Sequence, residues 1–300
     1  MLPPYLTDTD LDALIARALE EDLGSGDVTT QAIVAPETQA TGVFLAKEAG
    51  TLAGLEVARR VFAAVDPYVT VNWTRADGQR VEAGTVFGTV TGAAASLLMA
   101  ERLALNLLQR MSGIATATRR MVDRVRPYGT RILDTRKTAP GLRLLDKWAV
   151  RLGDGTNHRI GLFDMILIKE NHIAAAGGIE AALAAAQTYR ITHAEPLEIE
   201  IEVRTLEELQ RVLAYHEAHG GVEVVLLDNM TPRADDGSVD TTLLRRAVRL
   251  VDGQIGTEAS GNVTLATVEA IAATGVDAIS CGALTHSAAA LDLSLTIDLR

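Results

Sequence analysis

Six short apolar runs between residues 131 and 282, separated by segments of helical pattern, are the feature that most constrains the fold. The runs cover residues 131–134, 165–169, 197–203, 222–228, 254–260 and 277–282. The helical segments lie near residues 140–152, 178–190, 205–219, 241–251 and 264–274. Because strands that alternate with helices form parallel sheets, the sequence predicts six βα units in a barrel-like sheet.

The first third of the chain has a different pattern, in which helices and strands are mixed. Residues 8–22 form an amphipathic helical pattern that Thr9 or Asp10 can cap. The other predicted elements are strands at 39–47 and 80–91, a short helix at 55–62, and a long helix at 94–126 that Pro127 ends. We therefore expect an α/β fold with an N-terminal α+β sandwich domain and an incomplete parallel α/β barrel. The expected domains are residues 1–112 and 113–285, with the tail 286–300 returning to the first domain.

Charge and composition narrow the function classes. The net charge of −11 argues against a general nucleic-acid or anionic-membrane surface. A single cysteine, Cys281, excludes an internal disulfide and fits a reducing compartment. The first residues lack a signal-peptide pattern, and no apolar run reaches the roughly 18 residues of a membrane-spanning helix. We expect a cytoplasmic protein without nucleic-acid or membrane partners.

Polar residues cluster at the carboxyl end of each predicted strand. They are Asp134, Arg136, Lys137, Lys169, Glu202, Asp228, Glu258, Ser260, Cys281 and Gly282. In a βα barrel the carboxyl ends of the strands surround the active site, whereas the opposite face serves stability. Six units that agree in this way predict a functional site at one end of the barrel.

The predicted site is rich in cations although the chain is acidic. Residues 131–169 hold eight Lys/Arg and four Asp/Glu. Arg136, Lys137, His158, Arg159 and Lys169 would converge at the barrel mouth, and cations removed from water need anionic partners. Arginine forks suit carboxylates and phosphates, so we expect an anionic ligand. The alternative is a set of solvated or internally paired charges, which the four-residue spacing favours for Arg143, Lys147 and Arg151.

Acidic residues and small-residue turns complete the pattern. Glu198, Glu200 and Glu202 alternate along one strand face, and Glu202 lies nearest the strand end. Glu202 and Asp228 can hold a Mg²⁺ that bridges phosphates, or can pair with Lys169 and Arg136 instead. The turns at 258–264 and 280–286 follow the last two strands, where barrels often bind phosphate.

Several long motifs resemble one enzyme family. "ERLALNLLQRMSGIAT", "ILDTRKTAPGLRLLDKWAVRLGDGTNHR", "MILIKENHI", "VLLDN" and "EASGNV" are similar to those of quinolinate phosphoribosyltransferase, also called nicotinate-nucleotide pyrophosphorylase (carboxylating). The resemblance runs from about Ala18 to about Ser287. It implies an N-terminal α+β sandwich on an incomplete α/β barrel, and a homodimer or a multiple of dimers. It also implies the transfer of phosphoribosyl from phosphoribosyl pyrophosphate to quinolinate, with Mg²⁺, giving nicotinate mononucleotide, pyrophosphate and CO₂ in NAD biosynthesis.

The resemblance also implies roles for single residues. Arg102 matches an arginine that reaches the partner subunit's site. The substrate-binding residues it implies are Thr135, Arg136, Lys137, His158, Arg159, Lys169, Glu202 and Asp228, with Ser260, Gly261, Asn262 and Gly282 for the 5′-phosphate. Lys137, Lys169, Glu202 and Asp228 are the expected catalytic residues, and Glu202 and Asp228 the expected metal residues. The spacing leaves open whether Glu200 or Glu202 is the family's glutamate.

Three other functions remain open on the sequence alone. Lys169 at a strand end can serve as the Schiff-base lysine of an aldolase-type barrel. A phosphosugar-binding protein without catalysis would use the same cations. A related enzyme acting on another pyridine acid, such as nicotinate, is a narrower alternative.

Overall fold

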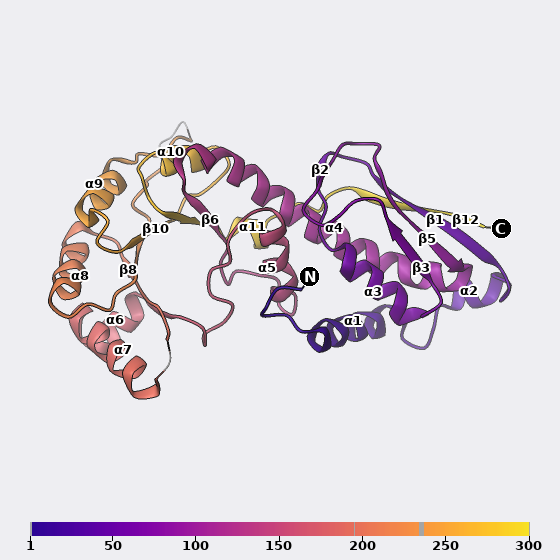
Figure 1. The fold of residues 1–300 in the computed structure, drawn as a ribbon, viewed down its shortest axis with the longest axis horizontal. Helices are drawn as coiled ribbons and strands as arrows, with labels where there is room; N and C mark the ends of the chain where they lie inside the picture. Colours follow the sequence, from indigo (N-terminus) through magenta and orange to yellow (C-terminus); the bar gives the residue numbers. More distant parts are fainter. Residues whose placement is uncertain (1, 195, 234–236, 300) are drawn as a thin grey trace. The chain divides into compact units, whose positions relative to one another are not determined.

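The structure is a computed structural model that describes residues 2–194, 196–233 and 237–299 (Figure 1). The chain divides into two compact units. The first unit consists of Met1–Arg119, Thr138–Asp154 and Leu284–Arg300, and the second of Arg120–Lys137 and Gly155–Ala283.

The first unit is built on a four-stranded antiparallel sheet. The strand order is β12-β1-β5-β3, formed by β1 (Gln39–Ala46), β3 (Thr70–Trp73), β5 (Val86–Ala93) and β12 (Leu293–Leu299). A smaller ribbon pairs β2 (Gly50–Thr51) with β4 (Arg80–Val81). Four aromatic rings from Phe44, Phe62, Trp73 and Phe87 pack against one another in the core of this unit. The sheet therefore buries one aromatic face.

Helices pack against this core. They are α1 (Asp8–Leu23), α3 (Leu55–Val65), the start of α4 (Ala94–Val125) and α5 (Arg143–Leu152). The short helix α2 (Val28–Ile33) belongs to the same unit, but its two large apolar side chains are exposed. The prediction that Thr9 or Asp10 caps α1 is wrong, because Thr7 is the N-cap residue and Asp10 closes a capping box from the third helical position. For Lys147 the structure excludes the solvated alternative, because this residue is fully buried, and internal pairing stays a prediction. Residues 145–150 of α5 are all buried, so this helix has no solvated side there.

The second unit contains the six predicted parallel strands. Their order is β6-β11-β10-β9-β8-β7. The strands are β6 (Arg131–Leu133), β7 (Ile166–Ile168), β8 (Ile199–Val203), β9 (Val224–Asp228), β10 (Gly256–Ser260) and β11 (Ala278–Ser280). Every residue of β8 and β11 is buried, as expected for strands covered on both faces. Among the described residues, β7 has no strand paired to its outer edge, whereas the outer edge of β6 forms a short parallel bridge between Leu133 and Thr156.

Helices follow the strands and lie along the outside of the sheet, as Figure 1 shows for α7, α8 and α9. The second unit holds η1 (Arg126–Tyr128), α6 (Glu170–Ala176), α7 (Ile179–His193), α8 (Leu206–His219), α9 (Thr242–Val251) and α10 (Val268–Ala272), and α11 (Ala283–His286) begins at its end. Thr205 and Glu208 form a capping box at the start of α8. Pro127 lies in η1 directly after α4, where the long helix was predicted to end.

The predicted fold class is confirmed: a sheet domain built mainly from the N-terminal part of the chain, to which β12 is added, and a parallel, open α/β barrel. The division at residues 112 and 113 stays a prediction. Among the described residues, no helix is both long enough and apolar enough to span a bilayer.

Candidate active site

The carboxyl ends of the parallel strands bring the predicted polar residues to one edge of the second unit. Thr135, Arg136 and Lys137 follow β6, Lys169 follows β7, and Ser260 ends β10. Since these strands run parallel and pair in register, their ends gather at the same side of the sheet.

A cavity of about 310 Å³ lies at this edge. Its lining includes seven residues predicted from the sequence, namely Thr135, Arg136, Lys137, His158, Arg159, Lys169 and Ser260. It also includes Glu258, which the sequence placed at a strand end without assigning it a role, and three residues that were not predicted: Leu167, Leu226 and Ser280. One cavity thus collects the cations of three separate segments of the chain.

The cations crowd one another. Burial, and then the positive charge of Arg136, lowers the pKa of the Arg159 guanidinium. Arg159 also donates a hydrogen bond from Nη1 to the carbonyl oxygen of Met165, 3.4 Å away. In this cavity the charge of Arg136 disfavours the charged form of Arg159. A bound anion would relieve that repulsion, so the cavity is electrostatically suited to an anion.

Asp134 positions two residues of the loop that follows. Its carboxylate is fully buried at the end of β6. One oxygen accepts a hydrogen bond from the backbone N–H of His158 at 2.9 Å, and the other accepts from Nδ2 of Asn157 at 2.5 Å. The backbone of residues 156–158 is therefore fixed against the strand that also delivers Arg136 and Lys137.

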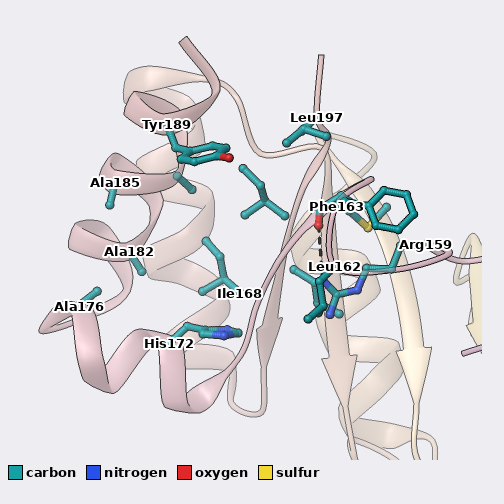
Figure 2. A pocket seen from close by; sticks show the side chains of 14 residues that line it. Arg159, Leu162, Phe163, Ile168, His172, Ala176, Ala182, Ala185, Tyr189 and Leu197 are labelled. Atoms are coloured by element: carbon teal, nitrogen blue, oxygen red, sulfur yellow. Dashed lines mark hydrogen bonds between the residues drawn. The ribbon is translucent and has the colours of Figure 1, made fainter. Parts of the chain in front are cut away.

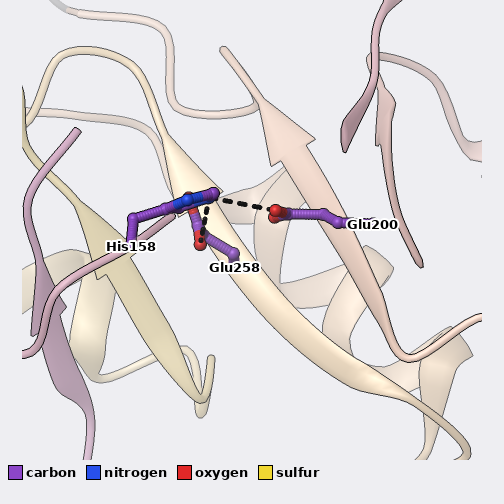
Figure 3. Close-up of side chains that lie close together, drawn as sticks. All are labelled: His158, Glu200 and Glu258. Carbon is purple, nitrogen blue, oxygen red and sulfur yellow. Dashed lines mark ion pairs between the residues drawn. The ribbon is translucent and has the colours of Figure 1, made fainter. Parts of the chain in front are cut away.

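His158 faces two buried glutamates, as Figure 3 shows. Its Nε2 lies 3.0 Å from Oε2 of Glu200 and 3.7 Å from Oε2 of Glu258. Its Nδ1 accepts a hydrogen bond from the backbone N–H of Arg159 at 2.7 Å, so the ring proton belongs on Nε2. Burial, and then the negative charge of Glu200, raises the pKa of Glu258 to about 7. The cavity floor can therefore carry a neutral carboxyl at neutral pH.

Glu202 and Asp228 lie at the ends of neighbouring strands, beside the two cationic side chains of Lys169 and Arg204. Nζ of Lys169 is 3.9 Å from Oε2 of Glu202. The guanidinium of Arg204 contacts both acids, at 3.1 Å from Oε1 of Glu202 and 3.4 Å from Oδ2 of Asp228. Burial, and then the charge of Asp228, raises the pKa of Glu202. Two carboxylates that repel each other in this way form a donor set that suits a hard divalent cation.

The two candidates for the family's glutamate, Glu200 and Glu202, have different neighbours in the structure. Glu200 faces His158 inside the sheet, whereas Glu202 faces Lys169, Arg204 and Asp228. In the part of the chain that the structure describes, one group of three metal-ligating side chains converges within 4.8 Å, and it is His158, Glu200 and Glu258. Period-two alternation put Glu200 and Glu202 on one face but could not assign their different partners.

Of the four residues predicted to bind the 5′-phosphate, Ser260 lines the cavity, whereas Gly261, Asn262 and Gly282 are not among its lining residues. Gly261 has a φ of +96°, and a Cβ atom there would lie 2.2 Å from Oδ1 of Asn229, so this turn requires glycine. Asn262 also has a positive φ and donates from Nδ2 to the carbonyl oxygen of Thr231 at 3.0 Å. Gly282 directly follows β11. Arg102 is exposed on α4 in the first unit.

A second, apolar groove of about 770 Å³ lies beside the free edge strand β7 (Figure 2). Figure 2 shows Tyr189, Ala185 and Ala182 of α7 on one side and Leu162 and Phe163 on the other. The side chains of Leu162 and Phe163 are 70% and 74% exposed. The sequence analysis did not identify this groove, although "GLFDM" places two large apolar residues in a loop.

Comparisons with known proteins decide the family. The model of the quinolinate phosphoribosyl transferase C-terminal domain matches residues 114–296, and that of the N-terminal domain matches residues 27–112. The chain belongs to the quinolinate phosphoribosyltransferase family. The resemblance found in the sequence is confirmed, and so is the enzyme class, a pentosyltransferase.

Individual relatives of this quinolinate phosphoribosyltransferase family member cover almost its whole length. The Arabidopsis thaliana chloroplastic nicotinate-nucleotide pyrophosphorylase (carboxylating) is 50% identical over 99% of this chain and 85% of its own. The Nicotiana tabacum mitochondrial quinolinate phosphoribosyltransferase (decarboxylating) 2b is 49% identical over 99% and 84%. The crystal structure of NadC from Streptococcus pyogenes superposes with a TM-score of 0.89, at 38% identity, covering 99% of this chain and 100% of that one.

Proposed function

We propose that the chain transfers the phosphoribosyl group of phosphoribosyl pyrophosphate to quinolinate, releasing pyrophosphate and CO₂ and forming nicotinate mononucleotide for NAD biosynthesis. The observation that carries this proposal is the single cavity into which Arg136, Lys137, Arg159 and Lys169 all project. Both substrates are polyanions built from carboxylates and phosphates. The family membership supports the same reaction.

The cations divide between the two substrates. Arg136 and Arg159 suit the quinolinate carboxylates, because guanidinium forks bind carboxylates in bidentate fashion. Lys137 and Lys169 act as point charges toward carboxylate and pyrophosphate oxygens. Ser260, Gly261, Asn262 and Gly282 offer hydroxyl, amide and backbone N–H groups to the 5′-phosphate. Thr135 and His158 complete the contacts to quinolinate.

Glu202 and Asp228 hold Mg²⁺, directly or through water. Their position at the ends of β8 and β9, and the raised pKa of Glu202 beside Asp228, support this assignment. When bound, the ion offsets negative charge on the pyrophosphate group. The two carboxylates also favour the positive charge that develops on the ribose as its bond to pyrophosphate breaks.

The residues act by positioning and electrostatics, without a protein nucleophile. Quinolinate held by Arg136 and Arg159 presents its ring nitrogen to the anomeric carbon, and Lys137 stabilises the departing pyrophosphate. Ribosylation makes the ring nitrogen cationic, so it stabilises the electron pair that stays on C2 when the 2-carboxylate leaves as CO₂, and a proton from water then completes the C2–H bond of the product. Water exclusion around that carboxylate favours its loss.

The competing Schiff-base function is less well supported. Activated lysine nucleophiles are desolvated, whereas the side chain of Lys169 is 49% exposed and lies beside Glu202. Trapping with borohydride and a carbonyl substrate would still reveal such an enzyme. No covalent adduct is expected.

The enzyme works as a homodimer or as a multiple of dimers. The exposed apolar side chains of Leu162 and Phe163 beside the free edge of β7 support a second copy at this groove. Arg102, which is exposed on α4, then reaches the partner subunit's cavity. We also place the chain in the cytoplasm, which its single buried Cys281 supports, although two plant relatives have organellar names.

The test combines both substrates in one tube and follows two products. Wild-type protein with quinolinate, phosphoribosyl pyrophosphate and Mg²⁺ should release CO₂ and pyrophosphate in equal amounts. Lys137→Ala should lower turnover by roughly a hundredfold or more, because it removes a charge from the reacting centre. Lys47→Ala is the matched control, since Lys47 makes an exposed ion pair with Asp292 in the first unit. Pyrophosphate without CO₂, or near-wild-type activity of Lys137→Ala, would contradict the proposal.

A further inference from the structure

Arg204 stands among three carboxylates at the ends of consecutive βα units. Its Nη2 lies 3.1 Å from Oε1 of Glu202, and its Nε lies 3.4 Å from Oδ2 of Asp228. Its Nη1 forms an ion pair with Glu170, the first residue of α6. Each nitrogen of one guanidinium therefore faces a different acid.

The four side chains differ in how freely they can move. Glu202 and Asp228 are fixed on strands and their side chains are 9% and 14% exposed. Arg204 and Glu170 lie outside the strands, with side chains 49% and 68% exposed. An arginine side chain has many rotamers, and Glu170 offers it a partner on the solvent side. Arg204 can therefore leave the two strand carboxylates without losing every partner.

Two cations cannot share the same two carboxylate groups without repulsion. The proposed function places a divalent cation at Glu202 and Asp228, which are the acids that the guanidinium contacts. We propose that Arg204 is an internal counter-ion that occupies the Glu202–Asp228 pair in the free enzyme and competes with the divalent cation for it. This inference rests on the proposed metal site.

The competition has a consequence for the order of binding. A divalent cation alone must displace Arg204 and gains only the two protein carboxylates. A cation carried by the donor's pyrophosphate brings further oxygen ligands with it, and Mg²⁺ is commonly bound by one or two carboxylates together with substrate phosphates. Arg204 thus discourages binding of the cation alone and favours its arrival with the donor.

The test measures Mn²⁺ binding to the full chain without either substrate, by electron paramagnetic resonance and by calorimetry. Arg204→Ala should bind Mn²⁺ about three- to tenfold more tightly than wild type, because each partly exposed ion pair is modest and two of them are removed. Arg204→Lys keeps the positive charge and should remain closer to wild type. Arg211→Ala is the matched control, because Arg211 is an exposed arginine paired with Glu180 on another part of the second unit, and its Mn²⁺ affinity should be unchanged.

Unchanged or weaker Mn²⁺ binding by Arg204→Ala would overturn the inference. An equal increase in the Mn²⁺ affinity of Arg211→Ala would also overturn it, because it would indicate a general effect of removing a positive charge. If wild type shows no binding, the inference requires measurable binding by Arg204→Ala. Circular dichroism of each variant checks the fold. Product formation by wild type is scored separately, so the failure of the counter-ion inference is distinguishable from failure of the proposed reaction.

Discussion

The buried carboxyl of Glu258 predicts how the free energy of unfolding changes with pH. Its carboxyl is 3% exposed, and burial followed by the charge of Glu200 raises its pKa from 4.5 to about 7. Three weaker influences lower this pKa: the charge of His158, a hydrogen bond from the hydroxyl of Ser280, and the charge of Arg131. Because the folded state holds this proton more tightly than the unfolded state, the protonated carboxyl stabilises the fold at low pH. The stabilisation is complete below about pH 4.5 and is lost as the pH rises through about 7.

The magnitude follows from the size of the pKa difference. A rise from 4.5 to about 7 corresponds to roughly 3 kcal/mol of unfolding free energy lost between those pH values. Glu258→Gln retains the shape of the protonated acid and cannot ionise. We therefore expect the variant's stability relative to wild type to increase by on the order of 3 kcal/mol between about pH 5 and pH 8.

Urea unfolding followed by far-ultraviolet circular dichroism, at a series of pH values, measures this difference. Glu180→Gln is the control, because the hydrogen bond from Arg211 lowers the pKa of Glu180 to about 2. Its stabilisation is present above about pH 4.5 and is lost only as the pH falls toward 2, so that variant should show a flat difference between pH 5 and 8. A flat difference for Glu258→Gln would refute the assignment of a buried, neutral carboxyl.

Three further variants test other features. Asp146→Asn should destabilise the fold by about 3 kcal/mol in a urea titration, because Arg110 donates two 2.8 Å hydrogen bonds to the fully buried Asp146 and would lose its counter-charge. Asp134→Ala removes the acceptor of the His158 and Asn157 hydrogen bonds. It should raise the KM for quinolinate more than it lowers kcat, which steady-state kinetics would show; an unchanged KM would contradict its positioning role. Phe163→Asp should shift the protein from dimer toward monomer in analytical ultracentrifugation, and a dimer as stable as wild type would exclude the groove from the interface.

The parallel sheet was predictable because each of its strands is marked by a pattern of residues that are neighbours in the sequence. Each strand of the second unit is a short apolar run with a polar residue at its end, and the six observed strands lie within the six predicted runs. The missed strand β12 has an equally readable alternation, in which Leu293 and Leu295 are buried. Its partner β1 lies far away in the chain, and no local pattern indicates which distant strand completes a sheet.

The site was predictable where a residue's role depends on its position at a strand end. Arg136, Lys137 and Lys169 were found in this way. The partners of Glu200, Glu258 and Arg204 depend instead on how neighbouring strands align. A signal for Arg204 was nevertheless present, because it follows Glu202 by two residues and therefore continues the same strand face.

The pairing of β1 with β12 sets an order of events during synthesis. Gly42 pairs with Ile297, roughly 250 residues later, so a ribosome adding about 5–20 residues per second takes on the order of 10 to 50 seconds between them. Throughout that interval β1 has one unpaired edge, and every strand of the parallel sheet is made before β12. The nascent chain therefore exposes an aggregation-prone strand edge until its last strand emerges, and a chaperone that shields this edge would raise the yield of folded enzyme.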